Sequence, residues 1–185
     1  MDVSRLSAAV KSAGNARFVD AWLAWRSDRL LPDRSAVDLR YVAADLPTIG
    51  VIEVRSPDEI VARIAGSALR QHHGTEMTGR SLREITTDAD WPVRSGRYLQ
   101  MTRQPCGSFY QGRDVLPTGQ VMEYEVVQLA LLPGAPDEPR QIIWNVMPLD
   151  QSFVLEPPTG PRTVPVSSRY VFVDIGASLP GAATP

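Results

Sequence analysis

The chain has 185 residues, 43% hydrophobic and 22% charged, enough to bury the core of one globular domain with appendages. Its formal net charge of -2 gives no electrostatic reason to expect a nucleic-acid partner, and its single cysteine, Cys106, excludes an internal disulfide and a cysteine-based zinc cluster. No apolar run approaches the ~20 residues that span a bilayer, and the N-terminus shows no basic-then-apolar signal pattern. We therefore expect a cytoplasmic protein without membrane contact.

Residues 1–47 are expected to form a helical N-terminal extension, with one helix over 4–30 and a second short helix over 38–44. Asn15 stands where it would cap the break between two pieces of the first helix. Apolar residues at helical spacing form one stripe, made of Phe18, Ala21, Trp22 and Trp25. Packing of this stripe onto the domain is one interpretation. The other is a homodimer contact through Phe18, Trp22 and Trp25, because aromatic residues are enriched at interface cores.

Alternating apolar residues predict five strands, near residues 49–55, 59–66, 108–116, 120–132 and 140–147. The turn at 56–58 should join the first two as a hairpin. Short helices follow the second strand: Ser67 would cap the first, which must stop at Gly74, and Ser81 with Glu84 has capping-box spacing. A longer helix is expected over 88–104.

Residues 151–185 form a tail whose first part is rich in proline and is not expected to fold alone. The apolar stretch 169–175 is expected to dock as a strand on a sheet edge. The last residues should fray.

The stretch "Gly-x-x-x-x-Gly-Arg-Ser-Leu" at 74–82, preceded by a strand and a short helix, resembles the middle of a PAS domain. Together with "Leu-Pro-Thr-Ile-Gly-Val-Ile-Glu-Val" at 46–54, it is similar to small solitary PAS-domain proteins found mainly in alphaproteobacteria. The similarity runs from about residue 18 to 150. It implies an α+β fold: a five-stranded antiparallel sheet with its last strand central and a helical cradle on one face, here over 48–150. It also implies a pocket for a small ligand or cofactor and dimerisation through an N-terminal helix.

Departures from the family's cofactor motifs argue against cofactors. Haem-binding PAS domains use a histidine of the long helix, which has none here. Flavin-binding light sensors carry Gly-x-Asn-Cys-Arg-Phe, whereas Cys106 lies in Arg-Gln-Pro-Cys-Gly-Ser and at a different place in the order of elements. Cys106 is expected to be an unreactive thiol. His72 and His73 are adjacent, so they diverge on a helix and do not easily hold one metal; we expect surface or helix-capping histidines. We expect no cofactor and no metal site.

No enzyme motif is present: there is no phosphate-binding glycine loop, no Gly-x-Ser-x-Gly, no His-Glu-x-x-His and no cysteine pair. Glu123 and Glu125 lie two apart on one strand face and are expected to be solvated rather than catalytic. The chain is therefore predicted not to be an enzyme.

The candidate ligand contacts lie on the inner face of the sheet and on the facing long helix. They are Trp91, Tyr98, Met101, Met122, Tyr124 and Trp144, with Gln128 and Asn145 as further polar candidates. Aromatic walls with a few polar groups describe both a small-molecule pocket and a filled core, and both interpretations stay open. Arg63 and Arg94 are candidates for binding a carboxylate, with surface ion pairs as the alternative.

The sequence thus favours a non-catalytic sensory module that binds a small ligand, a signalling protein partner, or both, and acts in trans, because no output segment is recognisable. A ligand would shift the population between two arrangements of the pocket or N-terminal helix. A constitutive interaction module with a filled core is the alternative, and an enzyme on a PAS-like scaffold is a weaker one. The identity of ligand and partner does not follow from the sequence.

Overall fold

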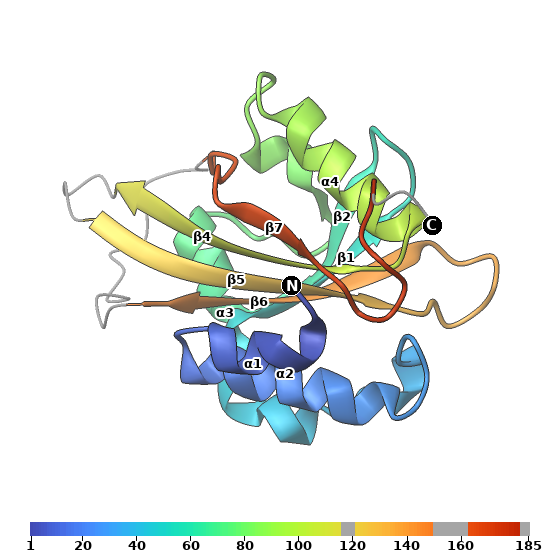
Figure 1. Ribbon diagram of the computed structural model, residues 1–185. Coiled ribbons are helices and arrows are strands. Elements are labelled where there is room, and N and C mark those ends of the chain that lie inside the picture. Colours follow the sequence, from blue (N-terminus) through green and yellow to red (C-terminus); the bar gives the residue numbers. More distant parts are fainter. Residues whose placement is uncertain (116–120, 150–162, 182–185) are drawn as a thin grey trace.

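The computed structural model describes residues 1–115, 121–149 and 163–181. Its centre is a seven-stranded antiparallel sheet with the order β3-β2-β1-β6-β5-β4-β7. Figure 1 shows α4 on one side of this sheet and α1 and α2 on the other. The strands are β1 Ile49–Val54, β2 Ile60–Ala65, β3 Arg80–Ser81, β4 Gly107–Val115, β5 Val121–Leu131, β6 Arg140–Pro148 and β7 Tyr170–Val173.

The five predicted strands are confirmed as β1, β2, β4, β5 and β6, and the last of them, β6, is central. β6 is buried on both faces along Ile142, Ile143 and Trp144, as expected for a strand covered on both sides. The prediction of five strands was too low, because two short edge strands complete the sheet. β3 was not foreseen, whereas β7 is the strand expected within 169–175 and pairs with β4. The predicted strand ends at 116 and 120, and residues 151–162 of the tail, lie outside the described residues.

The helices are α1 Leu6–Ala9, α2 Ala13–Arg26, α3 Ser67–His73 and α4 Trp91–Arg103, with 3-10 helices η1 Val3–Arg5, η2 Arg34–Ala36, η3 Leu39–Thr48 and η4 Leu82–Ile85. The helix expected over 4–30 ends at Arg26 and consists of two pieces, as the expected cap between them implied. Its break is capped by Ser12, whose side chain accepts from the Asn15 N–H, and not by Asn15 as predicted. Gly74 ends α3 in the left-handed conformation, and the Ser81–Glu84 capping box is present. No helix in the described part of the chain is long and apolar enough to cross a bilayer.

The sheet separates two hydrophobic cores. One lies between the sheet and the α3, η4 and α4 segments, and the other between the sheet and the N-terminal helices. Phe18 and Trp22 of α2 are fully buried in the second core, and Trp25 is 6% exposed. The Trp22 indole N–H donates to the Ala130 carbonyl of β5 at 3.0 Å. The stripe therefore packs onto the sheet of its own chain, and these three side chains do not offer the accessible surface that the expected dimer contact needs.

Candidate ligand pocket

One wall of the candidate pocket is α4, and the other is the inner face of the central strands. α4 follows Asp90 and has Pro92 in its first turn, where proline is tolerated because its missing N–H has no intrahelical partner. The helix buries one side against the sheet. The structure brings all six apolar candidates together in one buried cluster, namely Trp91, Tyr98, Met101, Met122, Tyr124 and Trp144.

Between these walls is a cavity of about 30 Å³. A single water needs about 10–15 Å³ in this measure, so the space holds about two waters and no metabolite. The cavity is lined by Leu69, His72, His73, Leu82, Ile85, Arg94, Tyr98, Tyr110, Tyr124, Val126, Trp144, Val146 and Val164. In this state of the protein the six aromatic and methionine candidates leave little room between them.

The sequence suggested that the two histidines lie at the surface, but the structure buries them. Each is 4% exposed, and both line the cavity. His72 Nε2 lies 3.2 Å from Asp114 Oδ2 of β4, and the two imidazole rings are 4.8 Å apart. The signal that could have placed them is their spacing: with Leu69 they occupy i, i+3 and i+4 of α3, one buried face. No group of three or more metal-ligating side chains occurs among the described residues.

The two polar candidates of the central strands lie on different faces. Gln128 is buried beside the pocket: its amide N–H donates to the Tyr98 hydroxyl at 3.0 Å, and its oxygen accepts from Ser108 at 2.7 Å. Burial raises the pKa of Tyr98, which keeps this hydroxyl protonated. Asn145 faces the N-terminal segment instead, where its oxygen accepts from Thr48 Oγ1 at 2.7 Å.

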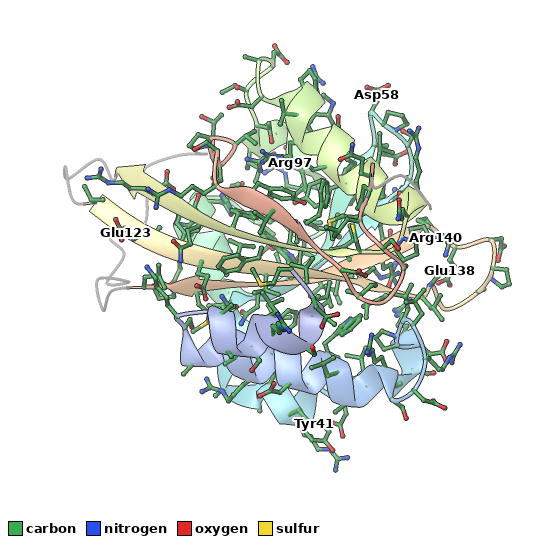
Figure 2. All side chains as sticks on the ribbon, viewed as in Figure 1. Tyr41, Asp58, Arg97, Glu123, Glu138 and Arg140 are labelled. Carbon is green, nitrogen blue, oxygen red and sulfur yellow. The ribbon has the colours of Figure 1, made fainter. Side chains whose placement is uncertain are left out.

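The two arginine candidates also separate. Arg63 lies on the opposite face of the sheet, where it forms an ion pair with Glu53 at 2.7 Å. For Arg63, the structure therefore matches the ion-pair interpretation and not a ligand contact in this pocket. Arg94 lines the cavity, and its guanidinium donates to the Val164 carbonyl at 2.5 Å. A third arginine, Arg97, was missed although it follows Arg94 by one helical turn; Figure 2 shows it between α4 and β7.

Residues Val164–Ser167, here called the strap, close the outer side of the pocket. One end of the strap is anchored by the Val164 N–H, which donates to the Ile85 carbonyl at 2.9 Å. The other end is anchored by Ser167 Oγ, which donates to the Gln111 carbonyl at 2.7 Å. A second cavity of about 30 Å³ lies under the strap and is lined by Arg94, Arg97, Tyr98, Tyr110, Gln128, Pro165, Val166, Ser167 and Tyr170.

Cys106 is fully buried at the end of α4, next to the pocket core. Burial raises the pKa of its thiol to about 12, so the reactive thiolate is scarce at neutral pH. The position agrees with the expected packed, unreactive thiol.

Comparison with known proteins identifies the family. A family model described as "PAS domain" matches residues 10–108. Among solved structures, a light-oxygen-voltage domain studied with a flavin analogue is 13% identical, with 64% of this chain and 90% of that chain covered and a TM-score of 0.43.

The PAS domain of an HTR-like protein from Haloarcula marismortui is 16% identical, with 55% and 79% covered and a TM-score of 0.36. The LOV protein of Rhodobacter sphaeroides is 10% identical, with 75% and 69% covered and a TM-score of 0.40. No curated protein matches the chain. With more than half of its length matched by the family model, the chain belongs to the PAS domain family.

Proposed function

We propose that the chain is a non-catalytic sensory module that binds a small molecule between α4 and the sheet and acts on a protein partner in trans. The observation that carries this proposal is the gathering of buried and half-buried polar side chains around the cavity. His72, Arg94 and Tyr98 come from two helices and meet Trp144 and Tyr124 of the sheet. A core that only fills space is built from apolar residues, since burying polar groups costs free energy.

Trp144 adds a second reason. Its indole N–H is buried, and it has no hydrogen-bond acceptor among the described residues. Buried donors in native proteins are nearly always paired, and one that is not calls for an explanation such as an absent ligand or water. The Trp144 indole nitrogen packs against Gly50 of β1, so a water or ligand acceptor that satisfies it would have to enter beside that glycine.

Native mass spectrometry of the freshly purified chain tests the proposal first, because it reports a bound mass directly. A thermal-shift screen of metabolites tests it again. A ligand at a hundred times its dissociation constant stabilises by about 2.7 kcal/mol, or about 5–11 °C for a chain of this size.

Two matched variants locate the site. Trp144→Phe should reduce the ligand-induced shift, because Trp144 lines the cavity. Trp22→Phe changes a buried tryptophan on the other face of the sheet, so it should lower the melting temperature and leave the ligand-induced shift unchanged. Equal losses of shift in both variants would contradict the proposed site.

The small cavity favours one alternative, a constitutive protein-interaction module with a filled core. The absence of any bound mass and of any hit in the screen would establish that alternative over a ligand sensor. We also propose that the chain works in the cytoplasm as a homodimer. Since Phe18, Trp22 and Trp25 are buried in one chain, the dimer must use other surfaces, and light scattering that finds only monomer at high concentration would overturn it.

A further inference from the structure

Entry of a ligand requires one wall of the pocket to move, because each of the two cavities holds only about 30 Å³. The sheet is a continuous hydrogen-bonded ladder, and α4 is a regular helix packed on it. The strap, Val164–Ser167, has neither helical nor strand hydrogen bonding. Its displacement leaves the sheet ladder and α4 intact.

Two guanidiniums of α4 hold the strap closed. Arg94 donates to the Val164 carbonyl at 2.5 Å, and Arg97 donates to the Ser167 carbonyl at 3.0 Å. Among the described residues, neither arginine has a carboxylate partner within salt-bridge distance. A carboxylate can accept two parallel N–H bonds from one guanidinium and adds the attraction between two full charges, and a backbone carbonyl supplies neither. An anion that reached the two arginines would therefore offer better acceptors than the strap carbonyls do.

The surroundings of the arginines favour an anion with an apolar or aromatic body. The Arg97 guanidinium lies over the Tyr170 ring, 4.1 Å from its centre, and Tyr110 stacks on Tyr170 with 5.5 Å between ring centres. Arg97 is half-buried, and the desolvation of its guanidinium lowers its pKa. A partly desolvated cation gains more from a carboxylate than a solvated one does.

We propose that the pocket takes a small carboxylate on an apolar or aromatic body, which binds Arg94 and Arg97 in place of the strap carbonyls and thereby opens the strap. This inference rests on the proposed function and adds the class of ligand and the element that responds to it. Arg94 and Arg97 then have two roles, as the latch of the closed state and as the anion site of the open state.

The strap is connected to the N-terminal extension through β7. The strand β7 begins at Tyr170, three residues after the strap, and the next residue after β7 is Asp174. The Asp174 N–H donates to the Met1 carbonyl, and its carbonyl accepts from the Val3 N–H, both at 2.7 Å. Arg26 of α2 donates to the Ile175 carbonyl at 2.7 Å. The strap is thus linked, by chain continuity and hydrogen bonds, to the N-terminal segment and to α2 on the opposite face of the sheet.

Three variants separate the latch from the anion site. Ser167→Ala removes the bond to the Gln111 carbonyl, loosens the strap and leaves both guanidiniums in place, so carboxylates should bind about 2–10-fold more tightly. Arg97→Gln also loosens the strap but removes part of the anion site, so carboxylates should bind roughly 10–100-fold more weakly. Arg97→Lys keeps the charge and should restore part of the affinity. A merely structural role of Arg97 would give the same sign of change as Ser167→Ala.

The probes are matched pairs of acid and amide: benzoate with benzamide, phenylacetate with phenylacetamide, and hexanoate with hexanamide. Calorimetry measures binding to the full chain, and hydrogen exchange of the Val164 amide reports the strap, because that N–H is bonded to Ile85 in the closed state. We expect at least one acid to bind more tightly than its amide and to accelerate exchange at Val164.

The outcomes separate this inference from the proposed function. Equal binding of acids and amides, abolished by Trp144→Phe, overturns the anion site while the sensory pocket stands. Binding of an acid with Val164 still protected overturns the opening of the strap. If no acid binds the wild type or Ser167→Ala at millimolar concentration, the class of ligand is wrong, and native mass spectrometry alone decides the proposed function.

Discussion

A buried carboxylate, Glu125 of β5, attaches the start of α2 to the sheet. Its side chain is completely buried and accepts hydrogen bonds from the Lys11 N–H at 2.9 Å, the Ser12 N–H at 3.2 Å and the Asn15 amide at 3.1 Å. The Lys11 and Ser12 groups belong to the break before α2, whose backbone donors have no partner within the helix. A negative charge at the N-terminus of a helix is also favoured by the helix dipole. We therefore predict that Glu125 is a principal anchor of the N-terminal extension.

The substitution Glu125→Gln changes the shape little and places an NH₂ donor where the carboxylate accepted from donors. At least one hydrogen bond to a charged acceptor is lost, and such bonds contribute about 1.5–3 kcal/mol each. We expect the free energy of unfolding to fall by about 2–3 kcal/mol, which corresponds to a melting temperature lower by about 4–12 °C.

Urea unfolding followed by tryptophan fluorescence measures this change, because Trp22 and Trp25 lie on α2. The matched control is Glu123→Gln, the same substitution two residues earlier on β5, at an exposed position (Figure 2). The control should remain within about 0.5 kcal/mol of the wild type. If Glu125→Gln is no more destabilising than Glu123→Gln, the assigned anchor is wrong.

Three further predictions concern other buried groups. Trp22→Ala should lower the free energy of unfolding by about 3–5 kcal/mol, as for a core tryptophan; an unchanged stability with loss of a dimer in light scattering would instead place Trp22 at an interface. Burial raises the pKa of Glu53, but hydrogen bonds from Arg55 and Arg63 outweigh it, and the net pKa lies below the ordinary value. The stability that the Glu53 carboxylate contributes is therefore present above its unfolded-state pKa and is lost as the pH falls through its folded-state pKa. The free energies of unfolding of the wild type and of Glu53→Gln should therefore converge in acid. Parallel pH profiles of the two proteins would contradict this. Cys106, whose pKa burial raises to about 12, should resist alkylation in the native chain and react in urea, and fast labelling without urea would show that the thiol is accessible.

The strands were predictable because their apolar residues alternate and glycine, proline and polar turns bound them. On β5, Met122, Tyr124 and Val126 share the inner face, and the structure buries all three in the pocket core. The same rule misjudged Glu125. On β5, Glu125 shares a face with Glu123, which is exposed. Charged residues that alternate near the start of a strand indicate a solvated face. The donors that make its burial tolerable come from residues 11–15, over a hundred positions away, and no local pattern indicates them.

The polar side of the pocket was harder to predict than its aromatic side. His72 and His73 were expected at the surface or as helix caps, because adjacent residues diverge on a helix, although their spacing from Leu69 marks one buried face of α3. The strap was missed for a different reason. A proline-rich tail cannot fold alone, so composition argues against structure there. Its order comes from partners elsewhere in the chain, which are Ile85, Gln111 and the two arginines of α4.

The two ends of the chain reinforce each other across the sheet. Asp2 and Asp174 form a parallel bridge, so the N-terminus runs beside the segment that follows β7 (Figure 1). Through this bridge the covering of one sheet face by α2 and the closing of the pocket on the other face by the strap become parts of one connected structure. The bonds between residues 1–3 and Asp174 therefore link the segment that carries the strap to the N-terminal extension. Under the proposed sensory function, such a link would carry a change in the pocket to another surface of the chain.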